Sequence, residues 1–404
     1  MPSETANIAP AIQPIPLSEP SIGGNEWSYV KQCLDTGWVS SAGSFVDRFE
    51  REFARQVGLT RAVAVSSGTA ALHLALLAAG VEPDDEVVVS TLSFIAPANA
   101  IRYCGAYPVF VDADVQSWQM DVGLVEDFLA GCRETPDGLI NPASGRRVSA
   151  ILPVHILGHP VDMEPLLAAA RRHKLAVVED ATESLGASYR GKPVGTLGDA
   201  GCFSFNGNKL LTTGGGGMVV TDREAVGEHV RHLSTQAKQD PVEYVHDVIG
   251  FNYRLTNVQA AMGCAQLEQI STFVSAKRRI AARYRQAFEG IAGLSTMPSQ
   301  PWAQPLFWLY TVLIEGGSRP LMRSLTEEGI QARPLWRCLH TNAPYRESQV
   351  IGGQVAESLQ CDALSLPSSV GLGEEDQERV IEAIRRALNY GHCPAIQATE
   401  ATST

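Results

Sequence analysis

Residues 150–180 read AILPVHILGHPVDMEPLLAAARRHKLAVVED and contain the pattern that decides the fold class. Two short apolar runs, 150–155 and 176–180, have the length of buried strands, and a helical pattern at 163–173 separates them. Parallel strands need a crossover connection, so this stretch predicts a strand–helix–strand unit. The same alternation continues on both sides of it, which predicts an α/β protein with a mostly parallel central sheet flanked by helices.

The alternation also predicts the other elements of this sheet. Expected strands cover 62–65, 86–90, 108–111, 201–205 and 217–221, and expected helices cover 67–80, 96–104 and 122–129. The polar, turn-rich stretch 131–147 interrupts the alternation and is expected to be a surface loop.

The apolar spacing of residues 255–285 is helical and indicates one long helix or two in succession. Such an element commonly bridges two domains. We therefore expect a large domain at 16–265 and a smaller α/β C-terminal domain at 266–392. The smaller domain should include a strand at 309–314 and a helix at 374–388. Residues 1–15 are expected to form a flexible arm, and 393–404 a flexible tail.

Composition excludes several classes of protein. The 404 residues are 45% hydrophobic and 19% charged, as in an ordinary globular enzyme, and the net charge is −12. An acidic chain has no electrostatic footprint for nucleic acid. No Cys-x-x-Cys pair is present, so no metal site is expected. With no basic leader and no apolar run long enough for a bilayer, we expect a cytoplasmic protein that binds no membrane.

Two short motifs lie where predicted strands meet helices. SSGTA at 66–70 combines small residues with a helix start, where exposed N–H groups and the helix dipole favour a phosphate. VVEDATE at 177–183 places Asp180 at the carboxyl end of a buried strand, where it could hold a protonated ring nitrogen. Each motif alone is equally compatible with an ordinary helix cap.

Two further motifs follow. FSFNGNK at 203–209 places Lys209 just past a strand, and the glycine run 214–217 comes shortly afterwards. A lysine ringed by small residues suits a Schiff base with a flat cofactor, although lone loop lysines are usually only solvated. GFNYRLTN at 250–257 places Asn252 and Arg254 before a helix, where both could contact an anion. Alternatively, Asn252 caps the helix and Arg254 is an ordinary surface residue.

Together the four motifs resemble one family closely. They are similar to the pyridoxal-phosphate-dependent nucleotide-sugar aminotransferases of fold type I, the DegT/DnrJ/EryC1/StrS type. The resemblance extends from TGWVS at 36–40 to LPS at 366–368. It implies a two-domain fold, pyridoxal 5′-phosphate as cofactor, and a homodimer with shared active sites.

The resemblance implies roles for individual residues. Lys209 matches the lysine that carries the cofactor in a Schiff base, and Asp180 matches the acid beside the pyridine nitrogen. Residues matched to the rest of the cofactor site are Gly68, Thr69, Phe94, Glu183, Ser204, Asn206 and Asn252. Among these, Phe94 matches a ring-stacking aromatic, although a plain core role is equally open. Asn252 matches a residue that reaches the phosphate from the neighbouring subunit.

Glu183 departs from one common pattern of the family, in which an amide bonds the cofactor's phenolic oxygen. A carboxylate would repel a phenolate there unless it were protonated or paired. The four substrate candidates are Trp38, His155, Arg254 and His340, with a structural role equally open for both histidines. Three arginines are candidates for binding the diphosphate of the nucleotide sugar, and the sequence does not rank them: Arg254, Arg333 and Arg337.

The implied reaction is ping-pong transfer of an amino group, with glutamate as the donor, to the ketone of a nucleotide-linked 4-keto-6-deoxy sugar. The run at 153–162 looks most like members that act on UDP-linked N-acetylhexosamines. A GDP- or dTDP-linked keto-sugar, at position 3 or 4, is the alternative. Lys209 argues against the related dehydratases, which have histidine there. A regulatory protein on the same fold is the hypothesis from a different class.

Overall fold

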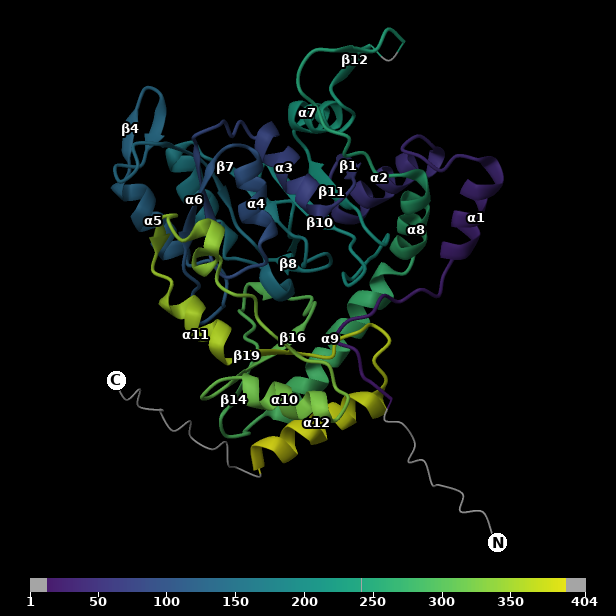
Figure 1. The fold of residues 1–404 in the computed structure, drawn as a ribbon, viewed down its shortest axis with the longest axis vertical. Coiled ribbons are helices and arrows are strands. Elements are labelled where there is room, and N and C mark those ends of the chain that lie inside the picture. Colours follow the sequence, from purple (N-terminus) through teal and green to yellow (C-terminus); the bar gives the residue numbers. More distant parts are fainter. Residues whose placement is uncertain (1–12, 241, 390–404) are drawn as a thin grey trace, which may run out of the picture.

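The computed structural model describes residues 13–240 and 242–389, and its centre is a ten-stranded sheet (Figure 1). The strand order is β1-β11-β10-β7-β6-β2-β3-β18, with β5 and β4 added beside β6. From β10 to β18 neighbouring strands are parallel, whereas β11 runs antiparallel to both β1 and β10. This arrangement confirms the mostly parallel α/β sheet.

The bounds of the strands follow the apolar runs. They are β1 Arg61–Val65, β2 Glu86–Ser90, β3 Tyr107–Val111, β6 Arg147–Leu152, β7 Ala176–Asp180, β10 Ala200–Ser204, β11 Gly217–Thr221 and β18 Val350–Ile351. Every residue of β2 is buried. A strand covered on both faces has no polar face to show, so it reads as a continuous apolar run rather than as an alternation.

Helices cover this sheet (Figure 1). They are α1 Glu26–Thr36, α2 Ser44–Val57, α3 Gly68–Ala78, α4 Ala96–Tyr103, α5 Val122–Gly131, α6 Met163–His173, α7 Glu224–Ser234 and α8 Asn257–Leu267. Helix α3 packs over β10 and β11 and against α4 and α7, while α5 packs against α6. Nearly all of α3 is buried, which explains its apolar sequence GTAALHLALLA.

The C-terminal part forms a smaller antiparallel sheet in the order β14-β16-β19-β17, below the large sheet in Figure 1. Its elements are α9 Ile270–Phe288, β14 Leu294–Thr296, β16 Tyr310–Ile314, α10 Arg319–Glu327, β17 Arg333–Pro334, α11 Gln354–Asp362, β19 Ala363–Leu366 and α12 Glu374–Asn389. The chain returns once to the large sheet, where β18 pairs with β3. The expected boundary at residue 265 falls inside α8.

The structure resolves residues 255–285 into two helices in succession, α8 and α9. The expectation of a surface loop at 131–147 was wrong, because β4 (Arg133–Thr135) and β5 (Gly138–Ile140) form a hairpin that continues the large sheet beside β6. Strands of three residues are too short to show an alternation of apolar and polar positions.

Short pairings complete the description. They are β8 Ser188–Tyr189, β9 Lys192–Pro193, β12 Lys238–Asp240, β13 Val245–His246 and β15 Ala303–Gln304. The N-terminal arm as far as residue 12 and the tail 393–404 lie outside the described residues. Ile15, at the end of the expected arm, is buried and pairs with Ile330. In the described part of the chain, no helix is long and apolar enough to cross a membrane.

Candidate active site

A cavity of about 370 Å³ lies where the carboxyl ends of β7 and β10 meet the start of α3. Parallel strands bring their carboxyl ends to one edge of a sheet, which is where open α/β sheets bind ligands. The lining residues are Ser67, Gly68, Thr69, Leu72, Phe94, Ala96, Thr182, Glu183, Ser204, Asn206, Asn208, Lys209, Gly215, Gly216, Trp308 and Trp336. Seven of the predicted site residues are therefore in one cavity.

Lys209 comes from a turn directly after β10, closed by a hydrogen bond from its own N–H to the carbonyl of Asn206. Its ammonium nitrogen Nζ lies 3.3 Å from Oε1 of Glu183 and 3.9 Å from the ring centroid of Trp308. The side chain is mostly buried. A lysine in this position presents its amine to the cavity while protein groups enclose it.

Asp180 is the last residue of β7 and is only 2% exposed. Its Oδ1 accepts a hydrogen bond of 3.1 Å from the N–H of Thr182. Burial raises the pKa of Asp180, and the hydrogen bonds from Thr182 and the charge on Lys209 oppose that rise. No cationic side chain within residues 13–240 and 242–389 forms an ion pair with Asp180, and a buried carboxylate of this kind is suited to a cationic ring nitrogen of a ligand.

Glu183 follows β7 and is also buried. Its Oε2 accepts a hydrogen bond of 2.8 Å from the N–H of Leu157, and its Oε1 faces Lys209. Burial raises the pKa of Glu183, and Lys209 and the Leu157 hydrogen bond oppose this rise. The carboxylate is therefore paired in this structure, which is one of the two conditions under which it could stay close to a phenolic oxygen.

The start of α3 forms a cradle that a phosphate fits. Ser67 caps the helix by accepting a hydrogen bond from the N–H of Ala70, and Thr69 and Ser204, which carry hydroxyl groups, line the cavity. A Cβ at Gly68 would lie 2.8 Å from Cβ of Ser204, and one at Gly217 would lie 2.5 Å from the carbonyl oxygen of Ser67. Only glycine permits these close approaches, which leave the helix N–H groups open towards an anion.

The remaining walls of the cavity are aromatic. Phe94 lines it with 54% of its side chain exposed, which fits a ring that covers a flat ligand rather than a core residue. Trp308 and Trp336 are nearly parallel, with ring centroids 6.4 Å apart. Taken together, the amine of Lys209, the carboxylate of Asp180, the helix cradle and the exposed ring of Phe94 fit pyridoxal 5′-phosphate.

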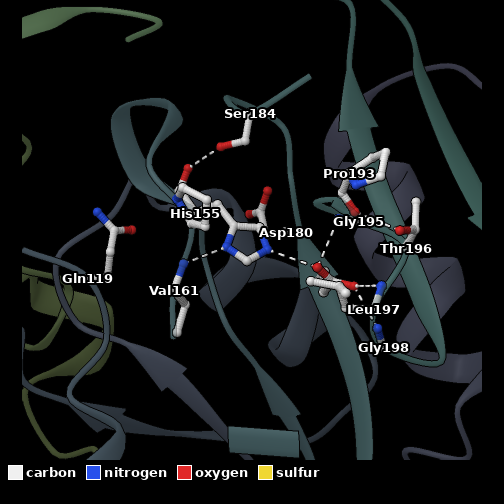
Figure 2. Close-up of polar contacts among 12 residues, drawn as sticks. Gln119, His155, Val161, Asp180, Ser184, Pro193, Gly195, Thr196, Leu197 and Gly198 are labelled. Carbon is white, nitrogen blue, oxygen red and sulfur yellow. Dashed lines mark hydrogen bonds and ion pairs between the residues drawn. The ribbon is translucent and has the colours of Figure 1, made fainter. Parts of the chain in front are cut away.

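His155, for which a structural role was equally open, is not among the residues that line the cavity. It is fully buried beside Asp180, where its Nε2 lies 3.0 Å from Oε2 of Glu179 and its Nδ1 accepts from the N–H of Val161 (Figure 2). These partners assign the proton to Nε2. Glu179 also accepts hydrogen bonds from three backbone N–H groups, at Gly195, Leu197 and Gly198.

The structure also places the other substrate candidates outside the cavity lining of their own chain. Trp38 is 59% exposed, and its carbonyl accepts a hydrogen bond from Asn257. Arg254 forms an ion pair with Glu50. His340 lies between the hydroxyl of Thr91 and the carboxylate of Glu357.

Three polar candidates bond elsewhere. Asn252 pairs with Thr235 through the backbone, outside the cavity lining. Arg333 donates to the carbonyl of Ala332, and Arg337 donates to the hydroxyl of Thr341. The cavity of one chain therefore holds Lys209 as its basic group, among the described residues, and none of the expected arginines.

Sequence reasoning missed Trp308 as a residue of the site. It lies 99 positions after Lys209 and two positions before the start of β16, and no local pattern links the two residues. Trp336 is part of the sequence PLW at 334–336, and no local pattern assigned it to the cavity either. Thr182 and Asn208 were visible as neighbours of Asp180 and Lys209, but which neighbours face the cavity depends on the turns.

Comparisons with known proteins show the family of the chain. The DegT/DnrJ/EryC1/StrS aminotransferase family matches residues 20–385. The GDP-perosamine synthase of Caulobacter vibrioides is 41% identical over 379 residues, which cover 93% of this chain and 98% of that protein. The GDP-perosamine synthase of Escherichia coli O157:H7 is 40% identical and covers 92% and 97%.

A solved structure of DesV from S. venezuelae, in complex with a ketimine intermediate, matches with a TM-score of 0.82 and 33% identity. The match covers 90% of this chain and 94% of that one. The fold and the cavity thus define a pyridoxal-phosphate-dependent aminotransferase. The chain belongs to the DegT/DnrJ/EryC1/StrS aminotransferase family.

Proposed function

We propose that this enzyme transfers an amino group from glutamate to the ketone of a GDP-linked 4-keto-6-deoxy sugar. The observation that carries the proposal is that Lys209 and Glu183 meet in one cavity, with the buried Asp180 at the end of the adjoining strand, in a chain about 40% identical to two GDP-perosamine synthases. The names of these relatives support the GDP-linked alternative rather than the UDP-linked N-acetylhexosamine. The cytoplasmic location stays a prediction.

Each residue has a part in this proposal. The bound cofactor supplies an electron sink for the charge left when a proton leaves carbon. Asp180 keeps the ring nitrogen protonated, and the start of α3 with Ser204 holds the phosphate. Lys209 holds the cofactor and, when its amine is free, moves the proton. The carboxylate of Glu183 balances the positive charge of the protonated amine and orients it.

The first experiment follows the half-reaction with the amino donor. Wild-type protein with pyridoxal 5′-phosphate should have a visible absorbance band that glutamate bleaches, and Lys209→Ala should not respond to glutamate. In the second step, GDP-, dTDP- and UDP-linked 4-keto-6-deoxy sugars are compared as acceptors by kcat/KM. Preference for a UDP- or dTDP-linked acceptor would reject the proposed GDP specificity but leave the aminotransferase unaffected.

We also propose that the active enzyme is a homodimer with shared sites. The hairpin that contains β12 and β13 projects from the body in Figure 1 and carries exposed apolar side chains, with Val242 78% exposed, and Ile249, three residues after β13, is 88% exposed. Asn252 follows this hairpin and does not reach the cavity of its own chain. A neighbouring subunit would cover the apolar surface and accept Asn252 into its site.

Mixing two inactive variants tests this arrangement. Subunits with Lys209→Ala and subunits with Asn252→Ala should each form inactive dimers. After subunit exchange, a mixed dimer would combine both defects in one site and leave the other site intact. Recovery of activity is expected. No recovery from dimers shown to be mixed, or a monomeric enzyme by light scattering, would contradict shared sites.

A further inference from the structure

Four contacts form a closed circuit around the Nζ atom of Lys209. Nζ lies 3.3 Å from Oε1 of Glu183, whose Oε2 accepts from the N–H of Leu157 at 2.8 Å. The carbonyl of Leu157 accepts from the N–H of Trp308 at 2.9 Å. The ring of Trp308 then lies over Nζ, with 3.9 Å between Nζ and the ring centroid. The circuit joins segments that are far apart in the sequence.

Leu157 connects the two halves of the circuit through a strained turn. Its φ of +58° and ψ of 10° are in the left-handed region, which is unfavourable for a leucine. In this conformation its N–H reaches Glu183 and its carbonyl reaches Trp308. The next residue, Gly158, lies so close that a Cβ would be 2.9 Å from the backbone nitrogen of Trp308. Strain of this kind concentrates at functional sites.

Trp308 is held at two further points. Its carbonyl accepts a hydrogen bond of 2.7 Å from Nζ of Lys277, a lysine on α9 that is 2% exposed and also donates to the carbonyl of Ser368. Its indole N–H donates to the carbonyl of Asn208, the residue before Lys209, at 2.8 Å. Every polar group of Trp308 is therefore bonded, so the ring is locked in place above the amine.

We infer that Trp308 is a positioning residue that holds the free amine of Lys209 against Glu183. The inference rests on the proposed role of Lys209. In transamination this amine is free while the amino group is carried on the cofactor, and a flexible four-carbon side chain must then stay within reach of the reacting carbon. An indole face attracts an ammonium group and excludes water from it.

Two substitutions separate the parts of this contact. Trp308→Phe keeps an aromatic face over Nζ and removes the indole N–H, whereas Trp308→Leu removes both. We expect Trp308→Leu to lower kcat with glutamate about 10- to 100-fold, with KM for glutamate changed less than about twofold. Trp308→Phe should recover a large part of the loss. Lys277→Met, which frees the Trp308 carbonyl, should lower kcat in the same direction.

A second measurement does not depend on turnover. The rate at which the apoprotein attaches pyridoxal 5′-phosphate is followed by absorbance, and it should fall about tenfold in Trp308→Leu, because the amine is less often in place. Trp336→Leu is the matched control, since Trp336 lines the same cavity and stacks on Trp308 without being the ring over Nζ. It should change the attachment rate less than Trp308→Leu does.

Two results would overturn the inference. One is a Trp308→Leu protein whose kcat and attachment rate equal those of the wild type. The other is equal slowing in Trp308→Leu and Trp336→Leu, which would show a general effect of the cavity wall. If Trp308→Leu does not fold, Trp308→Phe is compared with Trp336→Leu instead. Because Trp308→Phe keeps an aromatic face over Nζ, slower cofactor attachment in Trp308→Phe than in Trp336→Leu would contradict the role of the ring. Both readouts use glutamate or the cofactor alone, so an error in the proposed acceptor sugar does not affect them.

Discussion

The carboxylate of Glu183 and the amine of Lys209 lie 3.3 Å apart, although they follow different strands, β7 and β10, that pair in parallel. Each charge is largely removed from water, and the attraction between the two charges offsets only part of the cost of burying Glu183. The same contact therefore affects both the stability of the apoprotein and the position of the Lys209 amine.

Replacement of Glu183 by glutamine should stabilise the apoprotein at neutral pH by about 1 kcal/mol. Burial raises the pKa of Glu183 above its value in the unfolded chain. Between these two pKa values the native state binds more protons than the unfolded chain does, so the free energy of unfolding falls as the pH rises. Glutamine cannot ionise, and the gain should disappear at a pH below the unfolded pKa. Urea unfolding at acidic and neutral pH measures it. A gain independent of pH would contradict the assignment.

Asp180→Asn should lower the rate of the glutamate half-reaction by about 10²- to 10³-fold, because an amide cannot supply the negative charge that keeps a ring nitrogen protonated. Stopped-flow absorbance measures this rate. Asp199→Asn is the control: Asp199 pairs with Arg223 and bonds the backbone of Val177, near the opposite end of β7. It should affect stability only. A half-reaction of wild-type rate in Asp180→Asn would remove Asp180 from the mechanism.

Gly68→Ala should weaken cofactor binding at least tenfold and destabilise the protein by about 1–3 kcal/mol, because the new Cβ would lie 2.8 Å from Cβ of Ser204. Equilibrium binding of pyridoxal 5′-phosphate and thermal unfolding measure the two effects. Gly131→Ala, at a helix position with open space around it, should leave both unchanged. Unaltered cofactor affinity in Gly68→Ala would mean that the cradle does not receive the phosphate.

Arg254→Leu should destabilise the protein by about 3 kcal/mol, because it leaves the buried carboxylate of Glu50 with Arg231 as its remaining ion-pair partner. Glu50 also accepts a hydrogen bond from the N–H of Ala64 in β1. Unfolding and KM for the nucleotide sugar are measured on the same preparation. A large rise in KM with unchanged stability would instead assign Arg254 to substrate, through a neighbouring subunit.

Lys277 predicts a particular dependence of stability on pH. Burial lowers the pKa of Lys277 to about 7, so between this value and about 10 the unfolded chain binds the extra proton. Wild-type stability relative to Lys277→Met should therefore rise with pH, by at most about 1.4 kcal/mol per pH unit. Urea unfolding at pH 6.5 and 9.5 tests this, with the exposed Lys174→Met as control. A difference in unfolding free energy between wild type and Lys277→Met that is the same at both pH values would contradict the lowered pKa of Lys277.

Much of the fold and part of the site could be predicted from local pattern. Strands such as β2 and β7 are apolar throughout because both faces are covered, and their length and flanking turns identify them. The small residues at 66–70, together with the helix start, indicated where a phosphate could bind. The hairpin at 133–140 was not predictable in this way, because its strands are too short for a period to appear.

Sequence by itself therefore determined the chemistry: an amine after one strand, a carboxylate at the end of another and a helix start for a phosphate. These features are local, because strand ends and helix caps depend on neighbouring residues. Only the tertiary structure decided that His155 bonds Glu179 inside the core, that Arg254 forms an ion pair with Glu50, and that the ring of Trp308 lies over Nζ of Lys209. Such contacts join residues tens to hundreds of positions apart, and packing of the whole chain, not any local preference, selects them.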